Sequence, residues 1–170
     1  MLRSGAGSPA HLTMELLKGI AKIDMVHVPY KGGSHAITDL LAGQVNILVT
    51  TATTAAPYVR SGRIKALAVT TKKRSPALPD VPTMVEATGL ATYEANNWHG
   101  LMAPAATPRA IIAKLSTVVR AAMELKEVRE KLLAQGLDPS WTSPEEFGAY
   151  LKSETEKWSR VARDARVVAE

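Results

Sequence analysis

Residues 25–43 read MVHVPYKGGSHAITDLLAG, in which a short β-branched run, a glycine pair and an amphipathic helical segment follow one another. Ile37, Leu40 and Leu41 recur at the three-to-four-residue spacing of a helix, whereas 25–28 is typical of a strand. The succession repeats along the first two thirds of the chain, which predicts an α/β fold with a parallel sheet and crossover helices. Further strands are predicted at 45–49, 64–69 and 100–103, and a further helix on the stripe Leu12, Leu16, Leu17 and Ile20.

After Pro104 the sequence changes to a helical tail. A long helix is predicted around 111–119, a shorter one at 125–135, and a last one that Ser143 caps with Glu146 in a capping box. At most one short strand, at 138–141, accompanies these helices. Because a wide apolar helix face must be buried, we expect the tail to be covered by a second chain, in a homo-oligomer, through Ile112, Leu115, Val119, Phe147 and Trp158.

Composition narrows the function classes. The net charge of +5 arises from 21 Lys+Arg against 16 Asp+Glu, and the longest basic cluster is 72–74. No aromatic platform accompanies these charges, so a solvated surface is favoured over a nucleic-acid site. The absence of cysteine excludes disulfides, thiolate metal sites and cysteine nucleophiles. The opening residues 1–5 do not have the apolar stretch of an export signal, and no apolar run approaches the roughly 18 residues that span a bilayer.

Three segments predict helix starts at strand ends, namely 7–9, 32–34 and 50–57. Ser8, Ser34 and Thr54 are the expected caps, and Pro57 is expected within the first turn because a proline deeper in a helix removes a hydrogen bond. In a parallel sheet these starts share the carboxyl edge, where open α/β folds bind ligands. Unpaired amides and positive dipole ends there favour an anion. Capping alone is the alternative, and the sequence leaves both interpretations open.

The four histidines, His11, His27, His35 and His99, have no familiar metal-ligand spacing. His27 is interpreted as a packed histidine within a strand. Ser8 with His11 is the one close nucleophile and base pair, and without a third orienting group it makes a hydrolase the weaker alternative. We expect no cofactor, no metal and no catalysis; a pure interaction module is the other alternative.

Several motifs resemble one family over essentially the whole chain and in the same order. They are GAGSPAHL at 5–12, MVHVPYKGG at 25–33, DLLAGQV at 39–45, ALAVT at 66–70, RSPALPDVPT at 74–83 and WHGLMAP at 98–104. These stretches resemble the Bug, or TctC-like, extracytoplasmic receptors of tripartite tricarboxylate transporters.

The resemblance implies a periplasmic-binding-protein type II lobe in residues 1–103, and C-terminal helices in 104–170 that return to an incomplete first lobe. Family members are roughly twice this length, with two lobes around a ligand cleft. The front half of such proteins carries the export signal and most of the first-lobe sheet. The implied function is a periplasmic receptor that takes small carboxylates to membrane transporter subunits.

The resemblance also implies the ligand contacts of this lobe: Gly7, Ser8, His11, Gly33, Ser34, Thr50 and Thr51. Many relatives have an Asp-Asn pair where Thr50 and Thr51 stand, and that carboxylate can receive an ammonium group. We therefore expect a plain carboxylate ligand in preference to an amino acid. Trp98 and Tyr30 are each open to a ligand-contact or a packing role.

Overall fold

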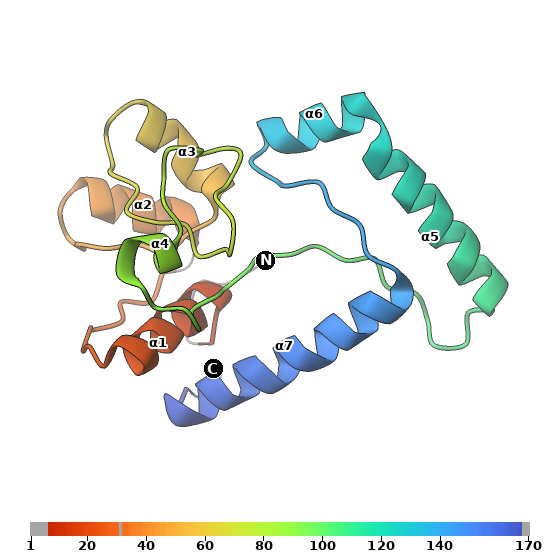
Figure 1. Ribbon diagram of the computed structural model, residues 1–170. Helices are drawn as coiled ribbons and strands as arrows, with labels where there is room; N and C mark the ends of the chain where they lie inside the picture. The colour runs from red at the N-terminus through yellow and green to blue at the C-terminus, as the bar shows by residue number, and fades with distance from the viewer. Residues whose placement is uncertain (1–6, 31, 168–170) are drawn as a thin grey trace.

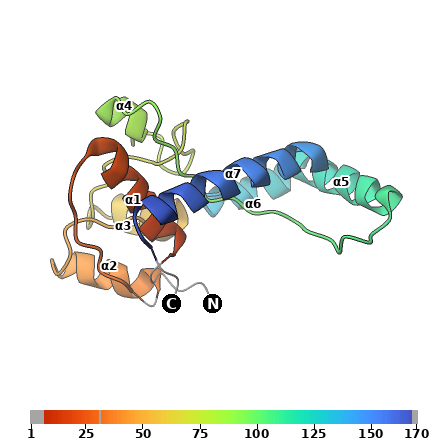
Figure 2. The same cartoon turned by 90° about the horizontal axis from the view of Figure 1, so that it is seen from below.

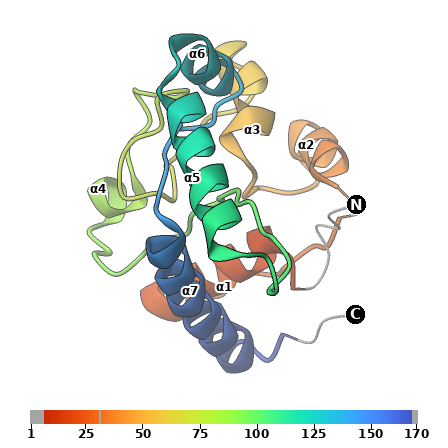
Figure 3. The ribbon, with the colours of Figure 1, turned by 90° about the vertical axis from the view of Figure 1, so that its right-hand side faces the viewer.

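The computed structural model describes residues 7–30 and 32–167. Helices α1 to α4 and their connecting loops form one group, and α5 and α6 extend away from it as an arm, with α7 returning along the arm to α1 (Figures 1 and 2). Within the group, α2 and α4 lie on opposite sides (Figure 3). The helices are α1 Pro9–Ala21, α2 Gly33–Leu41, α3 Ala52–Arg60, α4 Met84–Thr88, α5 Arg109–Glu124, α6 Lys126–Ala134 and α7 Pro144–Asp164.

The predicted strands do not form a hydrogen-bonded ladder within the described residues. Their strand pairing consists of one parallel bridge between Val69 and Thr83, flanked by a hydrogen bond from the Met84 N–H to the Val69 carbonyl (2.9 Å). A parallel sheet requires apolar cover on both faces, whereas Val26 is 92% and Leu67 61% exposed. The expectation of regular strands at 25–28, 45–49, 64–69, 100–103 and 138–141 is therefore wrong for the described residues.

The predicted helices are present in the structure; α1, α3 and α7 begin with a side-chain cap, whereas α2, α5 and α6 do not. The Ser143 hydroxyl accepts the Glu146 N–H (3.2 Å), and the Glu146 carboxylate accepts the Ser143 N–H (2.8 Å), so the predicted capping box is confirmed. Thr83 and Glu86 form a second capping box at α4. None of the helices within the described residues is long and apolar enough to cross a membrane.

The buried core lies entirely in the α1 to α4 group. Ile37 of α2 is the largest fully buried side chain, and the Ala56 methyl of α3 packs against Leu78 and Val81. Helices α5, α6 and α7 have no buried residue. The arm therefore holds its place through few contacts, and its apolar residues remain partly or largely exposed.

An aromatic cluster holds α7 to the segment that leaves the core. Trp98 meets Phe147 edge to face, with ring centroids 5.3 Å apart, and meets Tyr150 in the same way at 5.9 Å. The Phe147 ring also lies directly against the backbone of Gly100. Phe147 thus packs within the chain, unlike Leu115, which is 52% exposed.

Tyr93 links α1 to the segment that follows α4, since its hydroxyl donates a hydrogen bond to the Thr13 carbonyl (3.3 Å). Burial raises the pKa of Tyr93 to about 12. The unfolded phenol ionises near pH 10, so this stabilisation is complete below pH 10 and is lost as the pH rises towards 12. We expect the free energy of unfolding to fall by about 2 kcal/mol more in the wild type than in Tyr93→Phe between pH 9.5 and 11.5. Urea unfolding at the two pH values measures this, and parallel pH profiles would contradict it.

Candidate functional site

The three predicted helix starts, at 7–9, 32–34 and 50–57, are called the first, second and third junctions below. At the first junction the prediction of Ser8 as a cap is confirmed. The Ser8 hydroxyl accepts the His11 N–H (3.2 Å), and the Gly7 N–H donates to Nδ1 of His11 (3.1 Å). Gly7 has φ of 76°, a conformation that favours glycine. Since Nδ1 accepts a hydrogen bond, a neutral His11 carries its proton on Nε2, which lies 3.5 Å from Glu15 Oε1. Two of the donors at this helix start are therefore used within the junction.

The second junction is the most open. Gly32 is the N-cap of α2 and no side chain caps it, so the prediction of Ser34 as the cap is wrong. A glycine cap provides no oxygen acceptor, and the chain enters the helix one residue before Ser34. The exposed Ser34 lies within the first turn. Within the described residues the amides of Gly33, Ser34 and His35 have no hydrogen-bond acceptor.

The third junction begins earlier than predicted. Thr51 is the N-cap of α3 and its hydroxyl accepts the Thr54 N–H (3.4 Å), so the prediction of Thr54 as the cap is wrong. Pro57 lies inside the helix, beyond the first turn. The Thr51 hydroxyl also lies 2.6 Å from Thr53 Oγ1 and 2.8 Å from Thr54 Oγ1. This hydroxyl cluster stabilises an early start, which outweighs the one hydrogen bond lost at Pro57.

Contacts join the three junctions in a chain. A methyl group added at Gly33 would lie 3.6 Å from Thr50 Oγ1 and 3.8 Å from Thr54 Cγ2, so the second and third junctions are neighbours. The His11 ring stacks on His27 with centroids 3.8 Å apart and planes 7° apart. Because His27 lies in the segment that leads into α2, this stack ties the first junction to the second.

The packed role of His27 is confirmed by this stack, although no sequence pattern indicates His11 as its partner. Burial lowers the pKa of His27, and the neighbouring His11 lowers it further. Nε2 of His27 is buried without a hydrogen-bond partner. A protonated His27 would be partly desolvated and would lie beside His11, which together favour the neutral form of His27.

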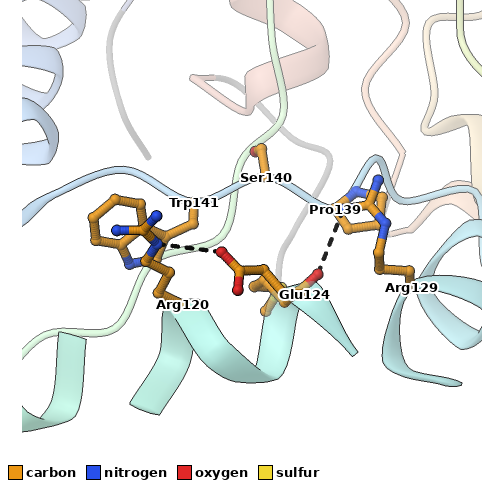
Figure 4. Close-up of a pocket in the computed structure, with 7 residues that line it drawn as sticks. Arg120, Glu124, Arg129, Pro139, Ser140 and Trp141 are labelled. Atoms are coloured by element: carbon orange, nitrogen blue, oxygen red, sulfur yellow. Dashed lines mark hydrogen bonds and ion pairs between the residues drawn. The ribbon is translucent and has the colours of Figure 1, made fainter. Parts of the chain in front are cut away.

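Two hollows of the described residues are lined by residues outside α2. One, of about 350 Å³, lies between the end of α5 and segment 139–141 (Figure 4), where the Arg120 guanidinium stands 5.3 Å from the Trp141 ring centroid and pairs with Glu124 at 3.2 Å. Another, of about 430 Å³, lies between α3 and the end of α6. At its rim a methyl group on Gly136 would lie 3.3 Å from the Thr53 backbone nitrogen. Sequence reasoning predicted neither hollow.

The family comparison covers nearly the whole chain. The model described as the tripartite tricarboxylate transporter family receptor, TctC, matches residues 3–166. The protein BugT of Bordetella pertussis is 36% identical over 160 residues, which are 93% of this chain and 48% of BugT. The chain thus spans about half the length of that relative.

Solved structures of related proteins also match this chain over nearly its whole length. Rpa4515 of R. palustris, determined with adipate, superposes with a TM-score of 0.79 at 34% identity, over 95% of this chain and 54% of that one. MatC of Rhodopseudomonas palustris, with bound malate, superposes with a TM-score of 0.72 at 34% identity, over 94% of this chain and 55% of that one. The structure therefore has the fold of the periplasmic solute-binding proteins. Within that class, the chain belongs to the TctC, or Bug, family of tripartite tricarboxylate transporter receptors.

Proposed function

We propose that the chain supplies one wall of a carboxylate-binding cleft in a periplasmic receptor, which passes its ligand to membrane transporter subunits. The observation that carries the proposal is the α2 start, where the amides of Gly33, Ser34 and His35 lack acceptors beside the Thr50 hydroxyl. Amides and the positive end of a helix dipole bind carboxylate oxygens. Adipate and malate in the two R. palustris structures support this ligand class.

The proposed contacts are divided unequally among the three junctions. Gly33, Ser34, Thr50 and Thr51 are proposed as the anion-binding part, which is supported by the closeness of Gly33 to the Thr50 hydroxyl. Gly7, Ser8 and His11 form a supporting part, since their polar groups already bond to each other and the His11 ring steadies the segment before α2.

We propose that the boundary between the two lobes of the receptor falls at residue 103 of this chain. Residues 1–103 then form the second lobe, and 104–170 are the helices that return to the first. Each lobe of such a receptor contributes part of the hydrogen bonds, and closure completes the set. The 170-residue chain alone should therefore bind weakly. A second copy of the chain is the further partner that we propose, held by the tail helices.

The ligand is proposed to be a plain carboxylate. Thr50 and Thr51 offer hydroxyl groups and no negative charge to an ammonium group. An amino acid would thus lose a charge-assisted hydrogen bond and would have to desolvate its ammonium group.

Amide chemical shifts test this proposal even for millimolar affinity. We expect succinate, adipate and malate to shift the amides of Gly33, Ser34, His35 and Thr53 saturably in ¹H–¹⁵N spectra, with aspartate weaker at matched ionic strength. Sodium chloride controls for salt, and succinamide controls for the carbon skeleton. Equal shifts from sodium chloride would refute the site, and a preference for aspartate would refute the ligand class.

The hydrolase alternative is disfavoured by the geometry at Ser8. A serine nucleophile needs an imidazole nitrogen that accepts its proton. Here the Ser8 hydroxyl accepts the backbone N–H of His11, while Nδ1 of His11 accepts the Gly7 N–H and Nε2 faces Glu15. We therefore propose a receptor and not an enzyme.

A further inference from the structure

The stack of His11 on His27 has a geometry suited to uncharged rings. The Gly7 N–H donates to Nδ1 of His11 at 3.1 Å. An imidazolium carries an N–H on both nitrogens, so a charged His11 would set two donors against each other at this contact. The hydrogen bond therefore requires the neutral ring of His11, and His27 lies nearly parallel to that ring with the centroids 3.8 Å apart.

His27 is placed even less favourably for a charge. Its Nε2 is buried without a hydrogen-bond partner within the described residues. Burial lowers the pKa of His27 and His11 lowers it further, whereas Glu15 raises it and Lys18 lowers it. Lys18 pairs with the Glu15 carboxylate at 2.8 Å, which leaves less of that charge to stabilise an imidazolium. The groups of α1 that act on His27 thus leave its neutral form favoured.

The stack lies just ahead of the first turn of α2, which has little hold of its own. Gly32 caps this helix without a side chain, and its carbonyl accepts the Ala36 N–H at a long 3.4 Å. The buried anchors of α2, Ala36 and Ile37, come one turn later. Residues 28–29, between the stack and the cap, are exposed. The His27 ring therefore gives the chain a fixed point before the unpaired amides.

We propose that His27 is a positioning residue for the carboxylate site: its neutral, stacked ring holds the unpaired amides of α2 in place, and its protonation releases them. This inference rests on the carboxylate site proposed above and adds a dependence on acid. The stacked ring has a pKa below the ordinary 6.5 of an unstacked one. As the pH falls below 6.5 the unstacked segment takes up a proton more readily, so acid favours it and lowers the apparent affinity.

Two substitutions separate the ring of His27 from its proton. Phenylalanine keeps a ring that can stack and removes the buried unpaired nitrogen, so His27→Phe should bind succinate within about twofold of the wild type at pH 7.5. His27→Ala should bind about fivefold more weakly at this pH, because the stack is lost. The amide shifts of Gly33, Ser34 and His35 in the complete chain give the dissociation constants. Equal affinities of His27→Ala and the wild type would overturn the positioning role.

The pH profile is the readout that a merely structural ring would not change. Between pH 7.5 and 5.5 the affinity of the wild type for succinate should fall about threefold more than that of His27→Phe. Protonation of succinate and any titration of His11 are common to both chains and cancel in the comparison. Parallel profiles of the two chains would refute the release by acid.

Failure of the carboxylate site itself would have a different signature. In that case none of the chains binds succinate saturably at pH 7.5, and the ligand-free spectra decide. The amide shifts of Gly33 and Ser34 should contain a step at the pKa of the His27 ring, followed through its own Cε1–H resonance, and His27→Phe should lack this step. Its persistence in His27→Phe would overturn the inference without reference to any ligand.

Discussion

Gly100→Ala is expected to lower the free energy of unfolding by about 1–3 kcal/mol, the usual cost of overpacking. A Cβ at this position would overlap Cζ of Phe147 and lie 2.9 Å from its Cε1. Phe147 cannot simply retreat, because Trp98 packs against the same ring. The backbone of Gly100 does not have the positive φ that would penalise alanine by itself. The loss therefore measures the packing of α7, and urea unfolding followed by tryptophan fluorescence quantifies it.

The matched control for this substitution lies in α7 itself. Gly148, one residue after Phe147, has open space around an added Cβ, so Gly148→Ala should stabilise the helix by about 0.8 kcal/mol through propensity alone. Hydrogen exchange should show faster exchange of the α7 amides in Gly100→Ala and slower exchange in Gly148→Ala. Stability losses of equal size in both variants would contradict the packing explanation.

Ser34→Asp is expected to weaken carboxylate binding at least tenfold and to stabilise the protein by about 0.3–1 kcal/mol. Ser34 is exposed in the first turn of α2, where an aspartate interacts favourably with the helix dipole. The same carboxylate would occupy the unpaired amides and repel an anionic ligand. Opposite signs for stability and binding distinguish a ligand site from a simple cap, and chemical-shift titration with thermal unfolding gives both quantities.

Thr38→Asp is the control for the added charge. Thr38 is exposed on the same helix, one turn further from its start. The dipole effect falls off within the first turn, so we expect Thr38→Asp to change carboxylate affinity less than threefold. If Thr38→Asp weakened binding as much as Ser34→Asp, general repulsion would explain the result and the α2 amides would not be the site.

The helices could be predicted because their signals are local. Ser8, Ser143 and Glu146 carry their capping partners within four residues, so the sequence pattern already contains the interaction. Thr54 was mistaken for a cap because Pro57 suggested a helix start three residues later than the real one. The competing signal was the Thr51 hydroxyl, whose contacts with Thr53 and Thr54 outweigh one lost backbone hydrogen bond.

Contacts between distant residues could not be predicted from periodicity. The stack of His11 on His27, the meeting of Gly33 with Thr50 and the packing of Phe147 on Gly100 all depend on how separate elements assemble. Strand patterns likewise state which segments favour a sheet, but a ladder forms only when a neighbour supplies hydrogen bonds and cover. The family resemblance predicted from the motifs is confirmed, and the ligand contacts carried over with it stay predictions.

The close approach of Gly136 to Thr53 joins the end of α6 to the start of α3. Thr53 stands in the first turn of α3, and Gly136 follows the end of α6, so this is a place where the arm meets the α1 to α4 group. The end of α6 is therefore a direct neighbour of the helix start at which we propose carboxylate binding.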